Sequence, residues 1–112
     1  MKYFFALIIL TVALMSFGCG KTNKTSSLPD KAFLVDVRTP DEFSGGSVPG
    51  AINIPLTTVA ASLGRFPSDV PVVVFCRSGN RSGKAKNILE SNGYTNVTNG
   101  GGWKEVLSAT QK

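Results

Sequence analysis

Two short apolar runs mark the most buried strands that the sequence predicts. The runs FLVDV (33–37) and PVVVFC (71–76) are rich in β-branched residues, and their apolar positions are nearly continuous rather than alternating. That pattern is typical of strands buried on both faces of a parallel sheet. The segments AINI (51–54) and TNVT (95–98) are weaker strand candidates.

Helix signals lie between these strands. Thr39 is placed to cap a helix that starts with a proline, and Glu42 is placed to complete a capping box. Residues 56–63 suit one or two helical turns, and residues 82–92 carry an apolar face with Gly93 beyond the last turn as a C-cap. Alternating apolar strands and helices predict an α/β domain with a mainly parallel sheet. Ligands of such sheets bind at the carboxyl ends of the strands.

The first eighteen residues predict a leader rather than part of the domain. Lys2 precedes an apolar run from Tyr3 to Phe17, and small residues follow it, which is the pattern of a secretory signal peptide. The run is shorter than the ~18 or more residues of a membrane-spanning helix. We therefore expect residues 1–18 to be a signal peptide, with an N-terminal membrane anchor as the alternative.

Cys19 directly follows this leader, in the segment MSFGCG. The arrangement resembles a bacterial lipobox, in which the cysteine becomes the lipidated first residue of the mature protein. Ser16 stands where lipoboxes usually have leucine, so a plain cysteine beside a cleavage site is the alternative. Residues 19–27 are expected to form the lipidated cysteine and a flexible polar tether, and residues 28–112 the domain. The predicted location is exported and membrane-anchored, in the periplasm or at the cell surface.

Composition narrows the classes of function. The chain has 112 residues, no histidine, two cysteines and a net charge of +5, which suits one small domain. The folded part has no basic stripe interleaved with aromatic residues, so we expect no nucleic-acid partner. It also has no metal-ligand cluster, and we expect neither a metal nor another cofactor. If Cys19 is acylated, Cys76 has no disulfide partner in the chain, and an unpaired thiol in an exported protein points to reactivity.

The loop after Cys76 carries the candidate chemistry. Cys76 ends the most apolar predicted strand, and its thiolate is the expected nucleophile, although an ordinary thiol with a pKa of about 8.5 is little ionised at pH 7. A helix N-terminus contributes only about 0.3–1 kcal/mol to the anion. We expect backbone N–H groups to curl around the sulfur, with Gly79 permitting the curl. The other expected members of the anion-binding loop are Arg77, Ser78, Asn80, Arg81 and Ser82.

The absence of histidine restricts the reaction. Cleavage of a peptide or ester by cysteine usually needs a base and then an acid for a poor leaving group. Attack on a sulfane sulfur, such as the outer sulfur of thiosulfate, expels sulfite, which leaves without first being protonated. A thiol or cyanide would then take the sulfur away in a ping-pong cycle.

Three segments carry a family resemblance. LVDVRTPDEFSGGSVPGAINIPL, VVVFCRSGNRS and NGGGW, in this order, closely resemble the single-domain rhodaneses, or thiosulfate sulfurtransferases. The resemblance implies about five mainly parallel strands flanked by helices, with Cys76 forming a persulfide. It also implies a small sulfur-containing anion as donor and a thiol or cyanide as acceptor. The family's first strand must be abbreviated here, and Ser47 stands where the family often has histidine.

Residues outside the loop are expected to support it. Asp36 and Arg38 belong to the family-like motif, and we expect Arg38 to pair with Glu42 across a turn. Trp103 is predicted to anchor the core or its rim. Residues 100–102 are predicted to form a tight turn with close backbone approach.

Other functions remain as alternatives. Cysteine-dependent phosphatases and some arsenate reductases use a Cys-x5-Arg loop, which would require an arginine where Ser82 stands; Arg81 comes one position too early. A persulfide carrier would use the same residues as the enzyme and differ only in its acceptor. A binding module without turnover is a further alternative, and the presence of Cys76 counts against it.

Overall fold

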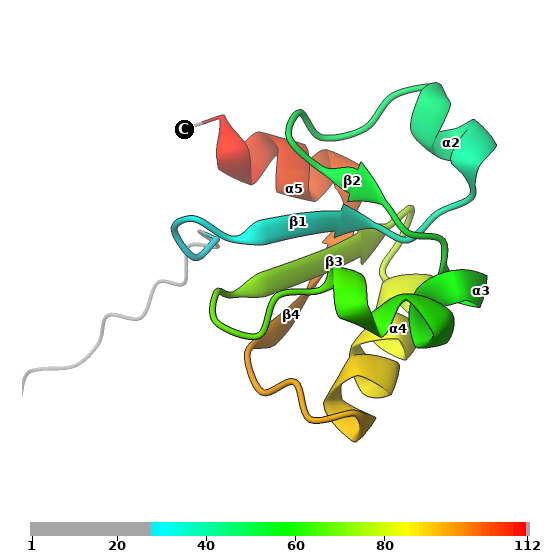
Figure 1. Ribbon diagram of the computed structural model, residues 1–112. Helices are drawn as coiled ribbons and strands as arrows, with labels where there is room; N and C mark the ends of the chain where they lie inside the picture. The colour runs from blue at the N-terminus through cyan, green and yellow to red at the C-terminus, as the bar shows by residue number, and fades with distance from the viewer. Residues whose placement is uncertain (1–27, 112) are drawn as a thin grey trace, which may run out of the picture.

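A parallel sheet with the strand order β2-β1-β3-β4 organises residues 28–111, the part of the chain that the computed structural model describes (Figure 1). All three neighbouring pairs of strands are parallel. The strands are β1 (Phe33–Asp36), β2 (Ile52–Asn53), β3 (Val72–Cys76) and β4 (Val97–Gly102). The predicted α/β fold with a mainly parallel sheet is therefore confirmed.

Helices cover both faces of this sheet. The helices of the described residues are α2 (Pro40–Ser44), α3 (Leu56–Val59), the 3-10 helix η2 (Ala60–Arg65), α4 (Asn80–Ser91) and α5 (Trp103–Thr110). Helices α3 and α4 lie together on one face, where Leu89 packs in one core cluster with Val74 and Cys76. Helix α5 covers the opposite face, where Val106 packs against Phe75.

Strand β3 is the centre of the domain. It pairs with β1 on one side and β4 on the other, and each of its five residues is at most 1% exposed. Burying one valine or phenylalanine side chain contributes about 1.5–3 kcal/mol relative to leaving it in water, so this apolar strand fixes the register of the sheet. Its last residue, Cys76, therefore lies at the carboxyl edge of the sheet, just before helix α4.

Several element boundaries differ from the sequence-based prediction. The capping box is confirmed: Thr39 Oγ1 accepts a hydrogen bond from the Glu42 amide, and Glu42 Oε1 accepts one from the Thr39 amide. Helix α4 begins at Asn80 rather than at residue 82. Helix α5 was not predicted. Among residues 28–111 the sheet has four strands, and residues 28–32 contain no abbreviated additional strand.

The predicted tight turn at residues 100–102 is wrong, because these glycines end strand β4. The register of β4 against β3 shifts between Val74 and Phe75, which is a β-bulge. Close approach explains the glycines: a Cβ at Gly100 would lie 2.8 Å from Val106 Cγ2, and one at Gly102 would lie 2.7 Å from the Arg77 carbonyl oxygen.

None of the helices within residues 28–111 has the length and apolar character that a membrane-spanning helix requires.

Candidate active site

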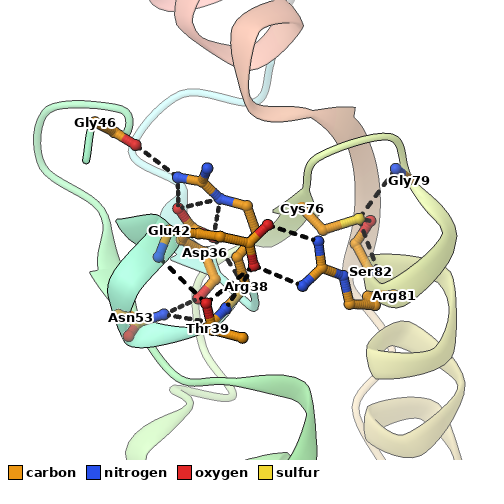
Figure 2. A network of polar contacts seen from close by, with 10 residues as sticks. All are labelled: Asp36, Arg38, Thr39, Glu42, Gly46, Asn53, Cys76, Gly79, Arg81 and Ser82. Carbon is orange, nitrogen blue, oxygen red and sulfur yellow. Dashed lines mark hydrogen bonds and ion pairs between the residues drawn. The ribbon is translucent and has the colours of Figure 1, made fainter. Parts of the chain in front are cut away.

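Cys76 lies at the bottom of the loop that joins β3 to α4. Its Sγ accepts hydrogen bonds from the Gly79 amide at 3.0 Å and from the Ser82 amide at 3.4 Å (Figure 2). Gly79 has a φ of 101°, a left-handed conformation that glycine adopts without strain, and this turns its N–H toward the sulfur. The loop is thus folded around the sulfur atom, and the N-terminus of α4 points at the same place.

The surroundings of Cys76 favour its anion. Burial by itself would raise the pKa of the thiol, but hydrogen bonds outweigh that effect. The Ser82 hydroxyl and the backbone amides of Ser82, Ser78 and Gly79 lower the pKa from 9.0 to about 7. A much larger share of the thiol is therefore ionised near neutral pH than for an ordinary cysteine, without a histidine. The arrangement therefore provides a nucleophile near neutral pH.

Arg81 does not point at the sulfur. Its guanidinium forms two hydrogen bonds with the Glu42 carboxylate, at 2.8 and 3.1 Å, and so connects α4 to α2 (Figure 2). This contact, followed by a hydrogen bond from the Thr39 amide, lowers the pKa of Glu42 to about 2. The same pairing raises the pKa of Arg81. The positive charge of Arg81 therefore sits beside the loop and is partly neutralised by Glu42.

The expected pairing of Arg38 with Glu42 is wrong. Arg38 instead binds the buried Asp36 carboxylate through Nε and Nη2, with the shortest contact at 2.7 Å. The Ser47 hydroxyl donates to the same carboxylate at 2.7 Å, and Arg38 Nη2 also donates to the Gly46 carbonyl oxygen. A buried carboxylate needs a cation and further donors to offset desolvation, which explains why Arg38 turns inward. This cluster holds the segment after β1 in place beside the Cys76 loop (Figure 2).

Arg77, Ser78 and Asn80 are exposed at the surface of the loop. Arg77 and Gly102 line a cavity of about 420 Å³ that adjoins the loop, together with Trp103 and Lys104. Two cations lie near the Trp103 ring, with its centroid 4.9 Å from the Arg38 guanidinium carbon and 5.6 Å from the Lys104 ammonium. Trp103 is half-buried and packs against the core cluster beneath α5, so the prediction that it anchors the core or its rim is confirmed.

Sequence reasoning missed Asn99. This strand β4 residue is 17 positions beyond Ser82, yet its Oδ1 lies 2.7 Å from the Ser82 hydroxyl and its Nδ2 donates to the Gly79 carbonyl oxygen at 3.0 Å. The sequence did contain a signal, because Asn99 comes directly before three glycines. Strand β4 runs parallel to β3, and this pairing brings Asn99 beside the loop that follows Cys76. Cys19, the predicted lipidation site, lies outside the described residues.

Comparison with known proteins identifies the family. The Rhodanese-like domain family matches residues 22–109. The chain belongs to this family. The thiosulfate sulfurtransferase PspE of Escherichia coli is 44% identical over 77 residues, which cover 64% of this chain and 71% of that protein. A human thiosulfate:glutathione sulfurtransferase is 32% identical over 106 residues, which cover 74% of this chain and 92% of that protein.

Coverage of the relatives is partial. The Bacillus subtilis protein YqhL is 43% identical over 76 residues, and the match spans only 60% of its length.

Solved rhodanese-like structures have the same fold as this chain. A rhodanese from E. coli determined with anions gives a TM-score of 0.60 at 41% identity, covering 66% of this chain and 89% of that one. A human single-domain sulfurtransferase gives a TM-score of 0.62 at 32% identity, covering 69% and 81% of the two chains.

Proposed function

We propose that this rhodanese-like protein is a sulfurtransferase that carries a sulfane sulfur on Cys76. The observation that supports this most directly is the loop itself, in which backbone amides and a hydroxyl surround the Cys76 sulfur and lower the thiol pKa to about 7. Relatives named as thiosulfate sulfurtransferases support the same reaction class. A thiolate without a partner base suits a substrate whose leaving group needs no proton.

The proposed cycle has two displacements. The Cys76 thiolate attacks the outer sulfur of thiosulfate, a new S–S bond forms, and the old S–S bond breaks with its electron pair leaving on sulfite. The product is a Cys76 persulfide anion. A thiolate or cyanide then attacks the outer sulfur of that persulfide and forms a new persulfide or thiocyanate, and Cys76 returns as a thiolate. Charge balances in both steps, and neither step requires an external oxidant or reductant.

The amide cradle and the nearby cations have separate roles in this proposal. Hydrogen bonds from the Gly79 and Ser82 amides hold the thiolate before attack and stabilise the persulfide afterwards. Three basic and two acidic side chains line the cavity beside the loop, and its net positive charge attracts an anionic donor. The position that a Cys-x5-Arg phosphatase loop would give to arginine is occupied by the fully buried Ser82, so the phosphatase alternative has no support here.

Intact mass measurement tests the proposal. The purified protein is incubated with thiosulfate, and we expect a gain of one sulfur atom that disappears when glutathione or cyanide is added. Cys76→Ser should show no gain. If the wild type gains no sulfur, or Cys76→Ser gains as much, the proposal is wrong. Hydrolysis of an aryl phosphate without sulfur transfer would support the phosphatase alternative instead. Sulfur loading without release to either acceptor would indicate a carrier that serves a protein partner.

The proposal includes the location expected from the sequence. We propose that the protein is exported and that Cys19 attaches it to a membrane through lipid, since the leader and the small residues before Cys19 follow the pattern of a lipoprotein signal. The donor and acceptor would then be those available outside the cytoplasm.

A further inference from the structure

The orientation of the Asn99 side chain is determined by two backbone groups. Its Oδ1 accepts a hydrogen bond from the Gly101 amide at 2.9 Å, and its Nδ2 donates to the Gly79 carbonyl oxygen at 3.0 Å. An amide N–H only donates and a carbonyl oxygen only accepts, so exchanging the oxygen and nitrogen of Asn99 would lose both bonds. The oxygen of Asn99 therefore faces Ser82.

Ser82 stands between Asn99 and Cys76. Its Oγ lies 2.7 Å from Asn99 Oδ1 and 3.4 Å from Cys76 Sγ, and the residue is fully buried. Asn99 Oδ1 cannot donate, so the proton of the shorter contact comes from Ser82. A hydroxyl has one proton. Ser82 can therefore donate to Asn99 or to the sulfur, but not to both.

Ionisation of the thiol changes which acceptor receives that proton. While Cys76 is protonated, its S–H donates to Ser82 Oγ, and the Ser82 hydroxyl donates to Asn99; every proton has an acceptor. A thiolate only accepts, so it competes with Asn99 for the Ser82 O–H, and Asn99 Oδ1 loses its hydrogen bond from Ser82 when that proton turns toward the sulfur. We propose that Asn99 is a positioning residue that competes with the Cys76 thiolate for the Ser82 proton and thereby holds back ionisation of the thiol.

The competition acts through the reaction cycle. In the proposed persulfide the charge resides on the outer sulfur, the inner sulfur is neutral, and the Ser82 proton is free to return to Asn99. Asn99 therefore favours the thiol and the persulfide over the free thiolate. The size of the effect corresponds to one neutral hydrogen bond, which is about a threefold to tenfold change in the ionisation constant of the thiol.

A thiol titration tests this inference. The full chain carrying Cys19→Ser has Cys76 as its single thiol, and the rate of its alkylation by iodoacetamide is followed against pH. We expect Asn99→Ala to move the midpoint down by about half to one pH unit. Asn96→Ala is the matched control, because Asn96 is an exposed asparagine in the segment before β4 whose side chain makes no hydrogen bond within residues 28–111. It should leave the midpoint unchanged.

Ser82→Ala decides whether the effect passes through the hydroxyl. In a Ser82→Ala background, Asn99→Ala should no longer move the midpoint, because there is no proton to compete for. Asn99 also holds the Gly79 carbonyl, so loosening of the loop is the competing explanation. Loosening would raise the midpoint and would do so with or without Ser82. An upward shift, no shift, or an equal shift in both backgrounds overturns the inference.

The inference rests on the proposed function only in taking Cys76 as the reacting atom. The titration contains no sulfur donor, so its result is independent of the mass measurement with thiosulfate. Failure of one test therefore leaves the other interpretable.

Discussion

Cys76 becomes nucleophilic through short-range contacts rather than through a neighbouring charge. Its sulfur is within hydrogen-bond distance of the Gly79 amide and of both the amide and the hydroxyl of Ser82. The arginines of the loop lie elsewhere, with Arg77 in solvent and Arg81 on Glu42. Backbone donors remain in place when salt concentration changes, whereas the attraction of exposed charges is screened. The pKa of the thiol should therefore depend weakly on salt concentration. Binding of the anionic sulfur donor should depend on it strongly.

The lowered thiol pKa predicts a dependence of stability on pH. The folded protein favours the thiolate, because the pKa of Cys76 is about 7 in place of 9.0. For an acid with a depressed pKa, the added stability is complete above the unfolded value and is lost as pH falls through the folded one. Relative to Cys76→Ser, the wild type should thus gain free energy of unfolding from pH 7 to pH 9. Urea unfolding at both pH values measures this.

The same comparison with Cys76→Ser also shows which result would contradict the predicted pH dependence. A difference between the two proteins that stays constant from pH 7 to pH 9 would mean that the thiol titrates alike in the folded and unfolded chains. The hydrogen bonds at the sulfur would then not favour the anion.

At the scale of elements, one ion pair connects α2 and α4 across the mouth of the site. Glu42 also closes the capping box of α2, so this carboxylate both starts its own helix and restrains the helix that follows Cys76. The side chains of Arg81 and Glu42 are 35% and 31% exposed. Solvent screening limits such a pair to about 0–1 kcal/mol. The larger effect of the ion pair should be that Glu42 partly neutralises the positive charge of Arg81 beside the Cys76 loop.

Glu42→Gln separates these two roles, because glutamine still completes a capping box. We expect a loss of about 0–1 kcal/mol in the free energy of unfolding at pH 7, because the ion pair is removed. The pKa of Glu42 is about 2, so the wild type loses this contribution as pH falls from 4.5 toward 2, and the two proteins should converge there. Because Arg81 is released, the KM for thiosulfate should fall.

Glu90→Gln is the matched control for this prediction. Glu90 pairs with Lys86 at 3.7 Å one turn away on the exposed side of α4, far along the helix from its N-terminus. Its removal should leave the KM for thiosulfate unchanged. An equal change of KM in Glu42→Gln and Glu90→Gln would show that only overall charge matters.

Sequence patterns predicted those elements whose signals are local. The apolar runs gave β1 and β3, and the capping box gave the start of α2, because neighbouring side chains decide each of them. Helix α5 was missed since its N-cap is Gly102, which has no side chain to mark the start. The pairing of Arg81 with Glu42, 39 positions apart, depends on the parallel sheet bringing two loops together, and no spacing in the sequence encodes it.

At the scale of the whole molecule, the family and the leader are supported by different parts of the chain. The family match starts at residue 22, and the related structures cover 66% and 69% of the chain. Residues 1–21 lie outside that match, so the proposed export and lipid attachment depend on sequence pattern alone. A result that contradicts export or lipid attachment would therefore leave the proposed chemistry of Cys76 unaffected.

Lipid attachment predicts a covalent label on Cys19. The full chain expressed in a bacterium that processes lipoproteins should incorporate radiolabelled palmitate and fractionate with membranes, because acyl chains partition into the bilayer in proportion to their buried CH₂ groups. Cys19→Ser should lose the label and the membrane association while keeping the mass gain from thiosulfate. Cys76→Ser is the matched control and should do the reverse. Palmitate retained in Cys19→Ser would show that the label is attached elsewhere and contradict the proposal, whereas an unlabelled Cys19→Ser chain that remains in membranes would support the uncleaved N-terminal anchor.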